Sequence, residues 1–510
     1  MIDLKNLRNA MRSDNPRGNS WLAGCLVFGI SIAVFLYALQ NVLVAEFVGI
    51  GAVLAVLFML GAASQAERKP MSKVRMWVTT DTKKCQEVDS LQWTEEMGQE
   101  GSTIRVIPGT TFQTILGWGA HFTDAACWVI SQMAEKAREA LLFELVDPSQ
   151  MDLTMNGFTI GASDYSPHDY TPFESAEPDP KLTKFSIAYD LEYKIPVLKQ
   201  VLKANGQVRY VARPWTPASW MKPGKQIRGG NMNYNFMDPW GDSFVMFDMA
   251  YEAAGVPIYA ITPQNEPDTD QNGSMPQTQL SIQQERDFVK DHLFPKLQKA
   301  GRKTLIWVHD HNFSTAGRPL SMFEDAGFLK CVGGLTWHPY EGDPKWMTWF
   351  RQKYPNIPQH ITEGTAVIFA PDYLTDHTNW SGQLTTYSRC GVNSVCWWNM
   401  VLDPDGKPNI GPFGCGGLVT VNLKTNEVIR SGQYWGTAHF SRFVKRDAKR
   451  IDSQGEIEKV QHVAFINTDG THALVLTNNG DACTVTVEVG YNTVNVALDK
   501  GSTTTLTWTA

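Results

Sequence analysis

The chain has 510 residues and a formal net charge of −7; 43% of its residues are hydrophobic and 19% are charged. This composition is typical of a globular protein with room for one to three domains. The negative charge argues against nucleic acid as a partner, because phosphate binding requires a basic surface. The eight cysteines form no CxxC pair, so we expect buried thiols, with one or two disulfides if the protein is exported.

Residues 21–63 form a long apolar segment with one charged residue, Glu46. The segment is about twice as long as one membrane span of about 20 residues. It fits a helical hairpin, a membrane anchor followed by an export signal with GAASQA as its cleavage site, or an over-long gene start. Basic residues flank both ends, so the positive-inside rule chooses no orientation. We expect residues 1–66 to bring the protein to a membrane or to direct its export.

Residues 111–430 alternate short apolar runs with stretches of helical periodicity. This alternation predicts a parallel sheet, and eight such units predict a closed (β/α)₈ barrel. Pro196 lies inside one helical pattern and should kink or split that helix. The eight expected strands lie within 114–123, 157–164, 208–215, 257–266, 304–310, 334–340, 359–364 and 394–400.

Residues 431–510 differ from the barrel region in amino-acid composition and pattern. They are rich in Val and Thr, with turn signals TDG, NNG and GYN, which predicts an antiparallel β-sandwich. Residues 75–110 also contain strand-like pieces and no helical pattern. We expect these strands to join the sandwich.

Two glutamates directly follow expected barrel strands: Glu266 in ITPQNEPD and Glu363 in QHITEG. Residues that follow the strands of such a barrel line its active-site face. A carboxyl pair about 5–5.5 Å apart performs double-displacement glycoside hydrolysis, in which one group attacks the anomeric carbon and the other protonates the leaving oxygen. Either glutamate alone would fit a helix-cap or loop position, but together, among Trp and Tyr residues, they favour catalysis.

Other polar residues at the strand ends have separate interpretations. Asn265 is placed to bind a sugar 2-hydroxyl, a contact that strengthens in the transition state. His309, Asp310 and His311 are not expected to form a metal site, because adjacent residues on a strand point to opposite faces. His338 is expected to be a hydrogen-bonded cleft residue.

Eight motifs recur in order between about Gly117 and Val444: GWGAHFTDAACW, GASDYS, PWTPASWMK, PQNEPD, WHPYEGD, ITEG, WWNMVLDPDGKPN and GTAHFSRFV. They resemble glycoside hydrolase family 30, the glucosylceramidase-like enzymes. The resemblance implies a retaining β-glycosidase on a (β/α)₈ barrel, with a β-sandwich built from both chain ends and no metal or cofactor. It implies that Glu266 is the acid/base and Glu363 the nucleophile. The sugar-binding positions that it implies are Asp164, Trp215, Asn265, Tyr340, Trp398 and Asn409.

An acid in this role must be protonated near the working pH, so we expect the pKa of Glu266 to lie above the ordinary value of about 4.3. One departure from the family concerns its partner. Family members usually carry an arginine seven positions before the aspartate matched by Asp164, where this chain has Gly157. Arg213, on the next expected strand, stands where the family usually has a small residue. Two interpretations stay open: Arg213 supplies the missing charge and keeps Glu363 ionised, or it contacts substrate or a neighbouring loop.

The sequence therefore predicts a retaining β-glycosidase that acts on a carbohydrate or a glycolipid, most simply a β-glucoside. The alternatives within the family are cleavage of β-1,6-glucan, β-xylosides or β-fucosides. An alternative of another class is a catalytically silent carbohydrate-binding barrel.

Overall fold

The computed structural model describes residues 29–32, 71–95 and 101–509. Met71–Ala510 group into one unit, and the account below concerns that unit. The apolar segment 21–63 lies almost wholly outside the described residues, so its contact with a membrane stays a prediction. Within the described part of the chain, no helix has both the length and the apolar character needed to cross a membrane.

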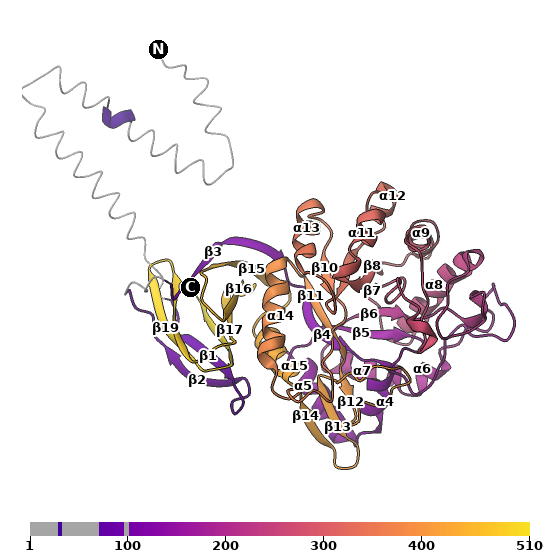
Figure 1. Cartoon of the computed structure of the whole chain (residues 1–510), viewed down its shortest axis with the longest axis horizontal. Helices are drawn as coiled ribbons and strands as arrows, with labels where there is room; N and C mark the ends of the chain where they lie inside the picture. The colour runs from indigo at the N-terminus through magenta and orange to yellow at the C-terminus, as the bar shows by residue number, and fades with distance from the viewer. Residues whose placement is uncertain (1–28, 33–70, 96–100, 510) are drawn as a thin grey trace, which may run out of the picture. The chain divides into compact units, whose positions relative to one another are not determined.

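Eight parallel strands close into a barrel, as the sequence predicts (Figure 1). Each strand overlaps one of the eight expected runs, and most are buried on both faces, which explains their continuous apolar character. The strands are β4 (Gly117–His121), β5 (Met155–Ile160), β6 (Arg209–Pro214), β7 (Ala260–Ile261), β8 (Leu305–Asn312), β9 (Gly334–His338), β10 (Gln359–Ile361) and β11 (Ser394–Asn399).

Helices connect the barrel strands, and the one that contains Pro196 is split as expected. The break lies at Tyr193, and Pro196 falls in the first turn of the second piece, where its missing N–H breaks no helical hydrogen bond. The helices are α4 (Asp124–Gln132), α5 (Glu135–Val146), α6 (Ala188–Glu192), α7 (Lys194–Ala204), α8 (Met237–Ala253), α9 (Ile282–Asp287), α10 (Phe294–Lys299), α11 (Gly317–Met322), α12 (Ala326–Leu329), α13 (Lys345–Lys353), α14 (His377–Cys390) and α15 (Gly432–Ser441).

Strands from both ends of the unit build a second, nine-stranded sheet in the order β19-β18-β3-β15-β16-β17-β20-β1-β2. Its strands are antiparallel as predicted, except that β3 runs parallel to β18. They are β1 (Val74–Thr79), β2 (Gln86–Leu91), β3 (Thr103–Thr114), β15 (Lys449–Gln454), β16 (Val460–Ile466), β17 (Thr471–Asn478), β18 (Cys483–Val489), β19 (Asn492–Leu498) and β20 (Ser502–Thr509).

The nine-stranded sheet curls so that its two halves share one core. Val78 of β1 and Leu506 of β20 belong to the same apolar cluster as Ile104 of β3 and Val487 of β18. The two edges are also joined, because Thr94 beyond β2 pairs with Thr493 of β19. The sheet is therefore folded into a sandwich. A small third sheet of β12 (Val401–Leu402), β13 (Val419–Asn422) and β14 (Glu427–Arg430) follows the last barrel strand.

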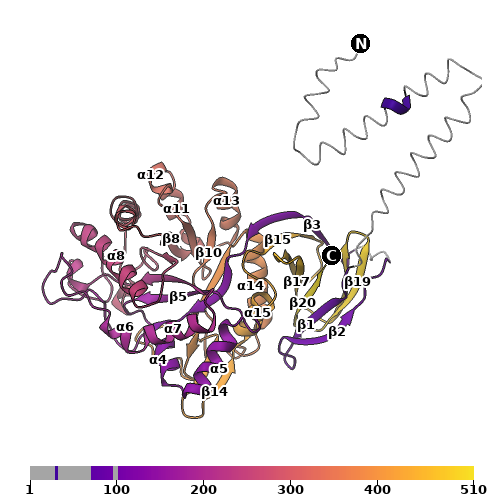
Figure 2. The same cartoon turned by 180° about the vertical axis from the view of Figure 1, so that it is seen from behind.

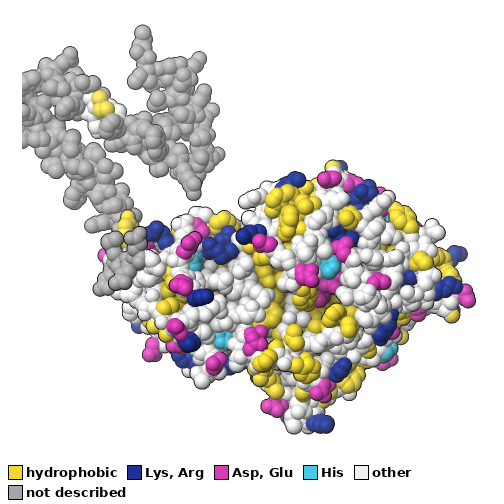
Figure 3. Space-filling model, viewed as in Figure 1, with side chains coloured by type: hydrophobic (Ala, Val, Ile, Leu, Met, Phe, Trp, Pro, Cys, Tyr) yellow, Lys and Arg dark blue, Asp and Glu magenta, His cyan; other side chains and the backbone are white. Residues whose placement is uncertain are grey.

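The seven described cysteines are all free thiols. Charged side chains of both signs are mixed with hydrophobic ones over the face of the unit seen in Figure 3.

Helices α14 and α15 lie between the barrel strands and the sandwich in both views (Figures 1 and 2). The contact contains buried histidines. His439 of α15 lies with its Nε2 2.7 Å from the Thr79 hydroxyl and its Nδ1 2.8 Å from the Thr505 hydroxyl. His377 of α14 makes the same kind of contact with Thr503 at 3.1 Å. Burial, with the nearby charges of His377 and Arg442, lowers the pKa of His439 well below its usual range. The ring is therefore neutral and holds the barrel to the sheet.

We predict that His439→Ala lowers the free energy of unfolding by about 2–4 kcal/mol at pH 7.5, because it leaves a cavity and removes one hydrogen bond from each of two buried hydroxyls. His439 stays neutral when folded but takes up a proton below about pH 6.5 when unfolded, so its contribution is present above that pH and is lost as the pH falls. The penalty should shrink by about 1.4 kcal/mol at pH 5.5. Urea unfolding of both proteins at the two pH values measures it, and a penalty that does not change with pH would contradict the neutral ring.

Candidate active site

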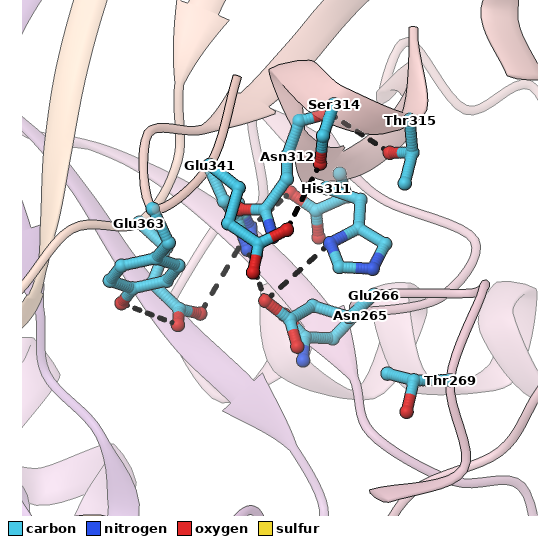
Figure 4. Close-up of polar contacts among 12 residues, drawn as sticks. Asn265, Glu266, Thr269, His311, Asn312, Ser314, Thr315, Glu341 and Glu363 are labelled. Carbon is cyan, nitrogen blue, oxygen red and sulfur yellow. Dashed lines mark hydrogen bonds and ion pairs between the residues drawn. The ribbon is translucent and has the colours of Figure 1, made fainter. Parts of the chain in front are cut away.

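Glu266 and Glu363 follow β7 and β10, and their carboxyl groups point toward one another at the carboxyl ends of the barrel strands (Figure 4). Both approach the imidazole of His338. Its Nδ1 lies 2.9 Å from Oε1 of Glu266, and its Nε2 lies 4.0 Å from Oε2 of Glu363. The side chains of the two glutamates are 12% and 10% exposed, so both remain open to a ligand.

The backbone holds Glu266 in an unusual conformation, with φ at 44°. Its N–H donates to the carbonyl of Asp310 at 3.0 Å, and Gln277 donates to its carbonyl at 3.0 Å. Left-handed backbone at a non-glycine residue costs energy and persists only where the surroundings fix it. The side chain is fixed as well, because Gln271 Nε2 donates to Oε2 at 3.0 Å.

Arg213 of β6 reaches the predicted nucleophile. Its Nη2 donates to Oε2 of Glu363 at 2.7 Å, and the hydroxyl of Tyr340 donates to the other oxygen at 2.9 Å. Nη1 of the same guanidinium lies 3.4 Å from both carboxylate oxygens of Asp310. Arg213 and Asp310 are completely buried. The positive charge that an arginine on the second barrel strand usually supplies in the resembled family is thus supplied here by Arg213 on the third barrel strand, β6.

Gly157 explains why the charge sits on β6 rather than β5. A Cβ atom at this position would lie 2.1 Å from Nε2 of His121, which shows that the His121 ring fills the space beside Gly157. His121 is buried inside the barrel, and its Nδ1–H donates to the carbonyl of Trp397 at 2.8 Å. An arginine side chain at position 157 therefore has no room while His121 is present.

Asp310 is a buried residue of the site that sequence reasoning did not identify. Hydroxyls of Thr362 and Thr262 donate to its two oxygens at 2.6 and 2.9 Å. Burial alone would raise its pKa, but Arg213 and His338 hold it far below the usual range. His309 and Asp310 both have positive φ, 81° and 51°, at an irregularity of β8. This bulge turns Asp310 inward and breaks the alternation of side chains on which the sequence prediction relied.

His338 carries the charge that links the two glutamates. Burial lowers its pKa, but Glu363, Asp310 and Glu266 outweigh that effect and raise it to about 9. The imidazolium donates from Nδ1 to Glu266 and from Nε2 to Asp310 at 3.3 Å. Nη1 of Arg213 lies 2.9 Å from the same Nε2, which can accept from the guanidinium only when the ring is neutral and donates to Asp310 when the ring is protonated.

The pKa of Glu266 differs from the prediction. Burial raises it, but the hydrogen bond and charge of His338, with His311 and Arg213, outweigh burial and lower the pKa below the ordinary value. For Glu363 the balance is reversed: burial and the charge of Glu266 outweigh His338 and Arg213 and raise the pKa. In the ligand-free site the predicted acid is thus ionised beside a cation. The sequence analysis did not predict this lowered pKa, because it expected His338 to be a hydrogen-bonded residue and did not assign it a positive charge.

The predicted sugar-binding residues fall into two groups. Trp215 and Trp398 stack at 4.9 Å, and the Arg213 guanidinium lies 4.9 and 5.1 Å from their ring centres. Asp164 is buried, and its pKa is raised well above the usual range by burial and by the charges of Glu363 and Glu266. Oδ1 of Asn265 is buried and has no hydrogen-bond partner. These side chains and Tyr340 surround the two glutamates.

Asn409 does not present its amide to the same space. Its Nδ2 donates to the Tyr165 hydroxyl at 3.1 Å and to the Phe413 carbonyl at 2.5 Å, and its Oδ1 accepts from the N–H of Gly411 at 2.7 Å. It therefore holds the loop between β12 and β13. Because Ile410 donates to the Asp164 carbonyl at 2.7 Å, this loop lies directly against the site.

One group of side chains could hold a metal ion: Glu266, His311 and His338, whose ligand atoms lie within 4.8 Å of one another. His311 belongs to the triplet that was not expected to form a metal site, and it converges with Glu266 and His338 rather than with His309 and Asp310.

Comparisons with known proteins agree with this geometry. Residues 115–444 match the glycosyl hydrolase family 30 TIM-barrel domain, and residues 447–506 match the beta sandwich domain of that family. An endo-1,6-beta-D-glucanase of Neurospora crassa is 28% identical over 406 residues, 76% of this chain and 83% of the relative. The lysosomal acid glucosylceramidase of Mus musculus is 22% identical over 405 residues, 74% of this chain and 77% of the relative.

Among solved structures, the endo-beta1,6-glucanase BT3312 is 28% identical, with a TM-score of 0.79 over 86% of this chain and 100% of its own. SrfJ from Salmonella typhimurium shares the fold, with a TM-score of 0.82 at 23% identity over 86% of this chain and 100% of its own. The family models cover both the barrel and the sandwich described above. The chain therefore belongs to glycoside hydrolase family 30 and is a glycoside hydrolase.

Proposed function

We propose that the protein is a retaining β-glycosidase in which Glu363 is the nucleophile and Glu266 the acid/base. One observation carries this assignment: Glu363 is paired with a guanidinium, whereas Glu266 is paired with an imidazole. A guanidinium keeps its proton at any working pH and favours an ionised nucleophile. An imidazole, even with its pKa raised to about 9 as in His338, releases its proton far more readily than a guanidinium, which suits a partner of the group that must cycle between acid and base.

In the first step, Oε2 or Oε1 of Glu363 attacks the anomeric carbon while the bond to the leaving oxygen breaks. Glu266 gives its proton to that oxygen, and a glycosyl ester of Glu363 remains. In the second step a water attacks the anomeric carbon, Glu266 takes the proton of this water, and the ester bond breaks. The two displacements give net retention.

The acid needs a proton that the ligand-free site does not hold. A sugar bound between the carboxylates removes water and raises the pKa of both groups. We propose that Glu266 takes up this proton, because the Arg213 guanidinium and the Tyr340 hydroxyl bind both oxygens of Glu363 and oppose the burial that raises its pKa. After the first step Glu363 is a neutral ester and no longer repels the negative charge of Glu266. The pKa of Glu266 then falls, and the group is ready to act as a base.

Around this pair, Asn265 supplies an acceptor for a sugar hydroxyl, since its Oδ1 is buried without a partner. The stacked Trp215 and Trp398 supply a rigid apolar wall. We propose β-1,6-linked glucan as the substrate, a proposal supported by the names of similar proteins such as the glucanases of Neurospora crassa and Trichoderma harzianum.

A second candidate is a β-glucoside with an apolar aglycone, such as a glucosylceramide. Exposed apolar side chains on the loops after β10 and β12 favour it. Val367 is 57%, Phe369 72% and Phe413 44% exposed, and they lie on segments joined by a backbone hydrogen bond from Ile368 to Gly414. The first of these loops follows Glu363, and the second joins β12 to β13 and contacts Asp164 through Ile410, so both border the site.

We predict that the relative cleavage rates of a panel of substrates will distinguish the two candidate functions. If β-1,6-glucan is the substrate, its oligosaccharides should be cleaved at least about tenfold faster than detergent-solubilised glucosylceramide, β-xylosides and β-fucosides. Phe369→Ser should then leave the glucan rate within about twofold, since an exposed side chain contributes little to folding. A preference for glucosylceramide that Phe369→Ser removes would instead establish the second candidate.

We predict that Glu266→Ala lowers hydrolysis of substrates with poor leaving groups by about 10²–10⁴, the usual contribution of a general acid. A dinitrophenyl β-glucoside needs little protonation and should keep its glycosylation rate within about tenfold, measured in the pre-steady state. Glu341→Ala is the matched control, since Glu341 is a neighbouring exposed carboxylate that accepts from Ser314 at 3.3 Å. Equal losses on both kinds of substrate would contradict the assignment.

We predict that Arg213→Ala loses most activity and moves the acidic limb of kcat/KM upward by roughly one pH unit or more, because the pKa of Glu363 rises without its partner. Arg213→Lys keeps a charge and should shift the limb less. An unmoved limb with a raised KM would make Arg213 a binding residue.

The sequence alone suggests that Gly157→Arg should restore part of the activity of Arg213→Ala. The structure changes this expectation, because the His121 ring occupies the space. We now expect recovery only when His121→Ala is added. Recovery in the Arg213→Ala, Gly157→Arg double variant without His121→Ala would contradict the packing described here.

A further inference from the structure

Three side chains from different strands of the barrel converge on one point at the edge of the site. Oε1 of Glu266 lies 2.9 Å from Nδ1 of His338 and 3.7 Å from Nδ1 of His311. His311 and Glu266 face each other in Figure 4. The three ligand atoms all lie within 4.8 Å of one another.

His311 has a feature that its place in the fold does not explain. Only 7% of the residue is exposed, and its Nδ1 is buried without a hydrogen-bond partner. This nitrogen points at the carboxylate of Glu266 but is too far away to donate to it. A buried polar atom without a partner is costly, and such atoms in native proteins often mark the place of an ion or a ligand.

The donor set has a clear chemical preference. Two imidazole nitrogens and one carboxylate oxygen suit zinc and the neighbouring transition metals, whereas magnesium and calcium prefer oxygen ligands. Bonds of about 2.0–2.1 Å place the ligand atoms of a tetrahedral zinc ion roughly 3.3 Å apart. The two separations that involve Glu266, 2.9 and 3.7 Å, bracket that value, and the two imidazole nitrogens lie within 4.8 Å of each other, so side-chain shifts of up to about 1.5 Å would complete the geometry.

The surroundings also suit a divalent cation. Nε2 of His338 lies 3.3 Å from Oδ1 of Asp310, which is the carboxylate–histidine arrangement that supports many metal-bound imidazoles. This buried network holds three carboxylates, those of Glu266, Glu363 and Asp310, against two cations, the guanidinium of Arg213 and the imidazolium of His338. A divalent ion would replace the proton between His338 and Glu266 and would add one positive charge to the network. The third carboxylate balances that added charge.

We propose that Glu266, His311 and His338 form a binding site for a divalent ion of the zinc class, and that the bound ion inhibits hydrolysis. The ion occupies the oxygen from which Glu266 delivers its proton. Three protein ligands leave one position for a water molecule or for a sugar hydroxyl. The binding site follows from the geometry alone, whereas the inhibition rests on the role proposed for Glu266.

The direct test is zinc binding to the full chain, measured by isothermal titration calorimetry and by the visible absorption of bound Co²⁺. We compare the wild type with His311→Phe, which keeps a ring but removes the nitrogen, and with His311→Asn in case the first variant is unstable. His292→Ala is the matched control, because His292 lies on the outer π-helix Phe288–Leu293. Wild type and control should bind one ion at this site. The His311 variants should bind it at least about 100-fold more weakly.

Activity provides the second readout, with each variant compared with its own metal-free rate. Zinc should inhibit the wild type over the range in which it binds, EDTA should restore the rate, and magnesium should have no effect. The His311 variants should lose this sensitivity. Equal zinc affinity in wild type and His311→Phe would overturn the site and leave the glycosidase assignment standing. Binding that depends on His311 but leaves hydrolysis unchanged would overturn the inhibition and count against Glu266 as the acid.

Discussion

A guanidinium that lies wholly inside a protein must be surrounded by carboxylates, and Arg213 is the point on which the rest of this barrel depends. It pairs with Asp310 and Glu363 and lies against the stacked rings of Trp215 and Trp398. Removing one partner of such a buried pair typically costs about 3–5 kcal/mol, because the other charge is left unpaired. The same contacts therefore stabilise the interior of the barrel and set the charge of the carboxylate that we propose as nucleophile.

The position of this arginine reflects an exchange between neighbouring strands. In this chain His121 of β4 fills the barrel beside Gly157 of β5, and Arg213 of β6 brings the cation to Glu363. Inward-facing residues of adjacent barrel strands are close neighbours, so one charge can reach the same carboxylate from either strand. The exchange involves three residues together, which explains why a single substitution at position 157 should not reverse it.

Much of this architecture could be predicted from the sequence. The eight strands were recognisable because most are buried on both faces and read as apolar runs. Glu266 and Glu363 could be located because each directly follows such a run. The bulge at His309 and Asp310 could not be predicted, since it depends on backbone angles that no local pattern specifies. The charge of His338, and with it the lowered pKa of Glu266, depends on contacts between residues far apart in the sequence. Asn409 matched a sugar-binding motif, but its amide is used within its own loop.

The central claim is that Glu363, held ionised by Arg213, forms a covalent bond to the sugar. Incubation with a 2-deoxy-2-fluoro-β-glucosyl fluoride tests it most directly, because the fluorine at carbon 2 slows the second displacement and lets the ester accumulate. Mass spectrometry of the intact protein and of its peptides should show one fluoroglucosyl group per chain, attached to Glu363. A label on Glu266 or Asp164, or complete turnover of the reagent with no covalent species at any time, would contradict the account.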